Sequence, residues 1–132
     1  MSAMTLMNAL LRNTYLWRLI LILSLIGILF LATTSQPYPI PSSGNDKINH
    51  VLAFVQLTLV SRLAWPGARP GILVAVLLGY GLSIELIQGQ LPYRYFSLAD
   101  LLADAVGIAI GCLPWPGVGS RASDRPSAPP AN

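Results

Sequence analysis

Nearly all the acidic side chains of this sequence, together with its single histidine, lie near the ends of long apolar stretches. Carboxylates beside an imidazole can transfer protons or bind the polar head of a ligand. Ionised groups at the centre of a membrane-spanning helix cost roughly 2.5–3.5 kcal/mol each on insertion scales. Because only 10% of the residues are charged, this placement indicates a functional polar cluster. Its candidate residues are Asp46, Lys47, His50, Glu85, Gln88, Arg94, Ser97, Asp100 and Asp104.

Helical spacing brings the members of each group onto one face. Residues three or four apart are neighbours on a helix surface, so Asp46 lies beside His50 and Glu85 beside Gln88. Polar groups left apart near lipid would lack hydrogen-bond partners. We therefore expect one outward-facing pocket in which Glu85 pairs with Arg94 and His50 meets Asp46 or Gln88.

The last apolar stretch carries two carboxyl groups and two glycines on a single face. With 3.6 residues per turn, Asp100, Asp104, Gly107 and Gly111 fall within about 60° of one another. Small residues let helix backbones approach closely in lipid. We therefore expect the glycines to pack against a neighbouring helix and the carboxyl groups to point into the bundle.

The composition is that of a membrane protein. The 132 residues are 54% hydrophobic and have a mean hydropathy of +0.61, and soluble domains carry about 25% charged residues. The fold class predicted is all-α, a polytopic membrane protein with four transmembrane helices, because four stretches approach or reach the roughly 17–25 residues that cross a bilayer. The expected spans are residues 16–34, 48–65, 71–88 and 97–115.

The distribution of basic residues predicts the orientation. Six of the eight lie at one end of the four spans, and cytoplasmic loops are enriched in Lys and Arg. We therefore expect a transmembrane domain over residues 1–116 in the cytoplasmic membrane, with both termini in the cytoplasm. Residues 117–132, rich in Ser, Pro, Ala and Gly, are expected to form a disordered cytoplasmic tail. Lys47 and Arg94 then lie outside with four of the five acids.

The first span has an alternative reading as a signal peptide. Arg12 and Arg18 resemble its basic region, and the small residues 32–34 resemble a cleavage site. The apolar stretch is long for a signal peptide, however, and cleavage would leave an odd number of spans. We therefore favour a transmembrane helix.

Several function classes are disfavoured by what the sequence lacks. No basic run with interleaved aromatic residues indicates nucleic-acid binding. One cysteine, Cys112, excludes an intrachain disulfide. A typical zinc site containing His50, the single histidine, would need three carboxylate ligands, so we expect no metal and no cofactor. The sequence has no His-Glu-x-x-His motif and no nucleophile elbow, which counts against an enzyme.

The order of these residues resembles the VanZ-like family of small bacterial membrane proteins over roughly residues 46–111. Asp104 departs from the family pattern, which usually has Asn there. The resemblance implies a multi-span protein of the cell envelope, and the family's namesake is associated with resistance to the antibiotic teicoplanin. The matching positions are Asp46, Lys47, His50, Glu85, Gln88, Arg94, Ser97, Asp100 and Gly107.

Three function classes remain open. The first, which we favour, is a non-catalytic envelope protein that binds membrane lipid and a lipid-linked or peptide-like molecule in its outer pocket. The second is an intramembrane enzyme that acts on a lipid headgroup through the carboxylates and His50. The third is a small proton-coupled carrier. Because the acids occur at one end only, no proton relay crosses a single bundle, which disfavours the carrier.

Overall fold

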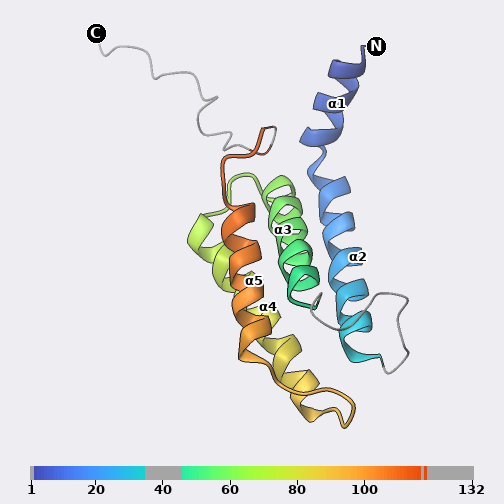
Figure 1. Ribbon diagram of the computed structural model, residues 1–132. Helices are drawn as coiled ribbons and strands as arrows, with labels where there is room; N and C mark the ends of the chain where they lie inside the picture. The colour runs from blue at the N-terminus through green and yellow to red at the C-terminus, as the bar shows by residue number, and fades with distance from the viewer. Residues whose placement is uncertain (1, 35–45, 117, 119–132) are drawn as a thin grey trace.

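The computed structural model describes residues 2–34, 46–116 and 118, and over these residues the chain is all-α without strands (Figure 1). Figure 1 shows α2 to α5 side by side, with α1 continuing from α2 beyond the bundle. The predicted all-α class is therefore confirmed for the described residues. The helices are α1 (Ala3–Arg12), α2 (Thr14–Thr33), α3 (Asp46–Ala64), α4 (Pro70–Gln90) and α5 (Leu98–Gly111). The predicted tail, apart from residue 118, lies outside the described residues.

Two of these helices, α2 and α4, are long and apolar enough to cross a membrane by length and composition. The prediction of four spans is therefore met only in part. Helix α3 carries charged residues at both ends, including Lys47 and Arg62. Helix α5 has 14 residues, fewer than the roughly 20 that a full span needs. It ends at Gly111, earlier than predicted.

Helix α1 was not anticipated by the sequence pattern. Its N-cap is Ser2, whose side chain accepts a hydrogen bond from the backbone N–H of Thr5. Asn13 ends α1 and caps α2, where its side chain accepts a hydrogen bond from the N–H of Leu16. Because Asn13 interrupts the helix, the apolar stretch begins as a separate element. No residue of α1 is buried.

The core of the bundle is built around α3, which packs most extensively against α5 and next against α2. Phe54 and Leu57 of α3 and Ile108 of α5 are almost fully buried there. A Cβ atom on Gly107 would lie 2.5 Å from the carbonyl oxygen of Val51. One on Gly111 would lie equally close to Thr58. The two glycines therefore permit α5 to lie directly on α3.

Arginine side chains close the ends of neighbouring helices. Arg18 of α2 donates from Nε to the carbonyl oxygen of Ala64 at 3.1 Å, at the end of α3. Arg62 of α3 donates to the carbonyl oxygens of Gly111 and Leu113, at 2.9 and 2.6 Å, at the end of α5. The last carbonyls of a helix have no partner within it and carry partial negative charge. Each arginine therefore stabilises a helix other than its own.

Candidate functional site

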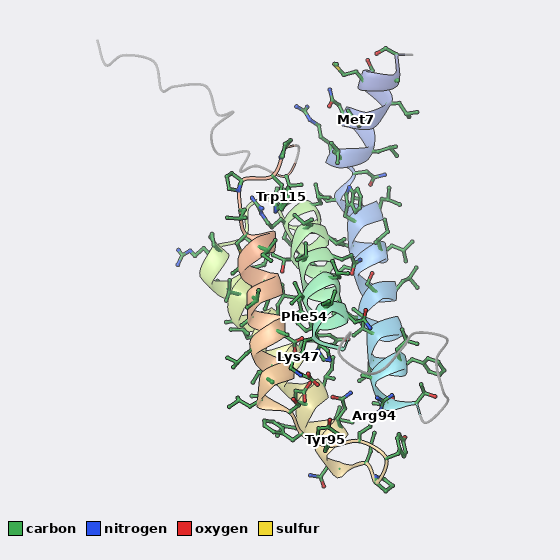
Figure 2. The ribbon with its side chains drawn as sticks, in the orientation of Figure 1. Met7, Lys47, Phe54, Arg94, Tyr95 and Trp115 are labelled. Carbon is green, nitrogen blue, oxygen red and sulfur yellow. The ribbon has the colours of Figure 1, made fainter. Side chains whose placement is uncertain are left out.

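The candidate site lies at the end of the bundle where α3 and α5 begin and α4 ends (Figure 2). This polar end is opposite the end that holds Trp115 in Figure 2. Helices α3 and α5 run in the same direction, opposite to α4, so their first turns meet the last turns of α4. The residues that gather there, called the polar cluster below, are Lys47, His50, Glu85, Ser97, Asp100 and Asp104.

His50 sits between two carboxyl groups of α5. Its Nδ1 lies 2.7 Å from Oδ1 of Asp104, and its Nε2 lies 3.7 Å from Oδ2 of Asp100. The prediction that His50 meets Asp46 or Gln88 is therefore wrong for Gln88. The side chain of Asp46, the first residue of α3, lies outside the described residues. The glycine contacts bring α5 against α3, so both acids that contact His50 come from the first two turns of α5.

Asp104 is almost fully buried, with only 1% of its surface exposed. It also approaches α4, where a Cβ atom added to Gly81 would lie 2.8 Å from Oδ2 of Asp104. Gly81 therefore leaves the space that the carboxyl group occupies. Sequence reasoning missed this residue, because a glycine in an apolar helix carries no sign of which neighbour it faces.

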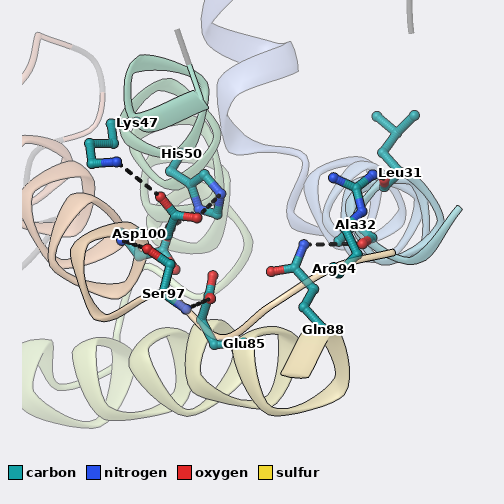
Figure 3. Close-up of polar contacts among 10 residues, drawn as sticks. Leu31, Ala32, Lys47, His50, Glu85, Gln88, Arg94, Ser97 and Asp100 are labelled. Carbon is teal, nitrogen blue, oxygen red and sulfur yellow. Dashed lines mark hydrogen bonds and ion pairs between the residues drawn. The ribbon is translucent and has the colours of Figure 1, made fainter. Parts of the chain in front are cut away.

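Glu85 is fully buried, and its two carboxyl oxygens differ in their surroundings. Oε2 accepts a hydrogen bond from the backbone N–H of Ser97 at 3.0 Å. Oε1 has no hydrogen-bond partner among the described residues. A buried acceptor without a partner costs about 1–3 kcal/mol, and more when it is charged. In Figure 3 the carboxyl group of Glu85 points toward Asp100 and His50.

Ser97 and Lys47 complete the polar cluster. Ser97 is the N-cap of α5, and its hydroxyl accepts a hydrogen bond from the N–H of Asp100 at 3.2 Å. Its own N–H is the one that reaches Glu85, so this residue joins the end of α4 to the start of α5. Lys47 Nζ lies 3.7 Å from Oδ1 of Asp100 and is mostly exposed.

Gln88 and Arg94 do not belong to the polar cluster. Gln88 donates from Nε2 to the carbonyl oxygen of Ala32 at 3.0 Å, and Arg94 donates from Nη2 to that of Thr34 at 3.1 Å. Both cap the end of α2, as Figure 3 shows. The predicted pairing of Glu85 with Arg94 is therefore wrong. The carbonyls at the end of α2 offer these side chains a nearer negative partner.

The polar cluster has the donor atoms of a cation site. His50, Glu85 and Asp100 each offer one atom, and these atoms lie within 4.8 Å of one another. Three carboxyl groups in the cluster outnumber its one lysine, so the site favours a positively charged partner. The 2.7 Å contact between His50 and Asp104 also suits proton transfer, since a carboxylate fixes the imidazole orientation.

Comparison with known proteins identifies the family. No curated protein and no solved structure matches the chain. The model of the VanZ/LLP1 family matches residues 8–118, a range that contains the whole polar cluster and all four helices of the bundle. Together with the order of polar residues and their meeting at one end of an apolar bundle, this match shows that the chain belongs to the VanZ/LLP1 family.

Proposed function

We propose that this chain is a cell-envelope protein of the bacterial cytoplasmic membrane that binds the polar head of a lipid-linked or peptide-like envelope molecule in its polar cluster. Membership of the VanZ/LLP1 family and the two long apolar helices support a membrane protein. The proposal places α2 to α5 in the bilayer, with the shorter α5 held inside the bundle by α3.

The observation that carries the proposal is the unpartnered oxygen of Glu85. A buried carboxylate oxygen near the membrane is stabilised when a ligand supplies a positive charge or a hydrogen-bond donor. Asp100, whose side chain is 19% exposed, lies beside Glu85 and brings the polar cluster to the surface. A polar head bound there would supply Glu85 with the missing partner.

The proposed orientation places the polar cluster on the outer face, where envelope molecules are assembled and where glycopeptide antibiotics act. The basic residues support it: Arg18, Arg62 and Arg69 lie at the opposite end of the helices, in agreement with an excess of positive charge on the cytoplasmic side. Reporter fusions after residues 40 and 92 should report the outer side, and a fusion at residue 68 the inner side. An inner signal at residue 40 would refute this orientation.

The family's association with teicoplanin resistance supplies the functional test. Expression of the wild-type chain in a teicoplanin-sensitive bacterium is expected to raise the inhibitory concentration, whereas Glu85→Gln, expressed to the same level, should not. Asp124→Asn, the same chemical change in the predicted tail, is the matched control and should behave like the wild type. Equal protection by Glu85→Gln and the wild type would exclude the polar cluster as the site of action.

The contact of His50 with Asp104 favours a second function, an enzyme that acts on a lipid headgroup. An imidazole oriented by a carboxylate is a common general base. Lipid extracts of cells that express the wild-type chain or His50→Gln distinguish the two functions. A headgroup product that appears with the wild type alone would establish an enzyme, whereas identical lipid profiles favour binding without chemistry.

A further inference from the structure

The geometry points to a divalent transition-metal site in the polar cluster, with His50, Glu85 and Asp100 as ligands. This inference rests on the proposed function because both use the polar cluster. It identifies the bound cation as a metal ion. The donor atoms of the three residues already lie within 4.8 Å of one another. Metal bonds of about 2.0–2.2 Å require somewhat closer spacing, which rotation of the Asp100 side chain can provide.

The unpartnered oxygen of Glu85 is a second and independent sign of a ligand. Its residue is 0% exposed, and Oε1 lacks a hydrogen-bond partner among the described residues although Oε2 is hydrogen-bonded. Figure 3 shows the carboxyl group of Glu85 on the side of Asp100 and His50, with one of its oxygens bonded to the backbone N–H of Ser97. A cation between the three side chains would satisfy the oxygen.

Two of the three ligands are held in place by further hydrogen bonds. Asp104 lies 2.7 Å from Nδ1 of His50, which leaves Nε2 for a metal, on the side that faces Asp100. The N–H of Ser97 holds Oε2 of Glu85 and leaves Oε1 for the same ion. Metal-binding histidines usually donate their second ring N–H to a carboxylate or a carbonyl oxygen. The polar cluster has this arrangement.

The sequence disfavours zinc because a typical four-ligand site with one histidine would need three carboxylates, but this set of three ligands does not require them. A closed site with four protein ligands would need three carboxylates beside His50. An open site needs only three protein ligands and leaves a position for water or for a group of a bound molecule. Mg²⁺ and Ca²⁺ prefer ligand sets made of oxygen atoms alone. One imidazole and two carboxylates therefore suit Zn²⁺ or Mn²⁺ better than they suit Mg²⁺ or Ca²⁺. The open position gives an anionic headgroup a place to bind.

The test is metal binding by the purified full-length protein in detergent, without any envelope molecule. After treatment with a chelator, the protein is titrated with Zn²⁺ and with Mn²⁺, and bound metal is measured by mass spectrometry. We expect one ion per chain and a higher melting temperature. Glu85→Gln should weaken binding at least tenfold, and Asp104→Asn by about 10–100-fold through the orientation of His50. Asp124→Asn should bind as the wild type does.

Cobalt substitution keeps the test decisive if a variant folds poorly. Co²⁺ bound to the wild type should give visible absorption bands that a His50→Gln variant with unchanged helical circular dichroism lacks. A wild-type protein that binds neither Zn²⁺ nor Mn²⁺, or that is stabilised by methylamine but not by these ions, would overturn the inference. If the wild type binds metal but does not protect cells from teicoplanin, only the proposed function would be contradicted.

Discussion

The two ends of the bundle use charge in opposite ways. At the end where α3 and α5 finish, called the arginine end here, Arg18 and Arg62 donate to backbone carbonyls of neighbouring helices. Arg18 also lies over the ring of Trp65, 4.9 Å from its centroid. At the polar end, charged side chains contact one another, and Oε1 of Glu85 has no hydrogen-bond partner among the described residues. The charges of the arginine end stabilise the fold, whereas we propose that those of the polar end bind a ligand.

Arg94 lies at the polar end, but like Arg18 and Arg62 it donates to backbone carbonyl oxygens at the end of another helix. It donates to the carbonyl oxygens of Thr34 and Leu31, at 3.1 and 3.5 Å. The end of the bundle at which a charged residue lies therefore does not decide what it contacts. Arg94 donates to backbone carbonyls of another helix, whereas Lys47 and His50 contact carboxyl groups.

The largest expected effect comes from separating α3 and α5, on which the geometry of the polar end depends. Gly107→Leu places its side chain against the backbone of Val51 and should lower the free energy of unfolding by about 3 kcal/mol or more. The measurement is the melting temperature in detergent. Gly79→Leu is the matched control, because nothing lies within 4 Å of a Cβ atom there. Equal losses in the two variants would disprove the close contact.

An intermediate effect is expected at Arg94. Arg94→Ala removes the donors that cap the end of α2 and should cost roughly 1–3 kcal/mol of stability. The activity per folded molecule, measured as teicoplanin protection normalised to folded protein in the membrane, should remain. Arg69→Ala, at an exposed position without a side-chain cap, serves as the control. Complete loss of activity in a well-folded Arg94→Ala protein would move this residue into the polar cluster.

The smallest change in stability is expected at Glu85. Glu85→Gln retains the shape of the side chain, and the atom that replaces Oε1 loses no hydrogen bond, so stability should change by less than about 1 kcal/mol. Teicoplanin protection should nevertheless be lost, and metal binding should weaken at least tenfold. Thermal unfolding of the metal-free protein tests this separation. A large loss of stability would mean that Glu85 supports the fold in the same way as the arginines do.

Much of the architecture follows from the sequence, because apolar length and terminal prolines or glycines mark helices strongly. The ends of the first three predicted apolar stretches lie within about two residues of the ends of helices α2, α3 and α4. Spacing also predicted that Asp100, Asp104, Gly107 and Gly111 share one face. Asp104 and both glycines are buried in the structure.

The partners across helices could not be predicted in the same way. Spacing along a helix fixes which residues share a face, but not which other helix that face meets. The contact of His50 with the acids of α5 was therefore not predicted. Gly81 of α4, which lies against Asp104, was not predicted as part of the site either. Arg94 was assigned to Glu85 because opposite charges were matched, whereas the carbonyls at a helix end carry no mark in the sequence.

The cap on α2 sets an order for assembly of the protein during synthesis. Thr34, whose carbonyl oxygen accepts from Arg94, precedes it by 60 residues along the chain. Gln88 likewise reaches Ala32 across 56 residues. The end of the first long helix therefore acquires these hydrogen bonds only after α3, α4 and the start of the following loop have been translated. Until then, water or lipid headgroups must solvate its last carbonyls, which favours keeping that end at the membrane surface.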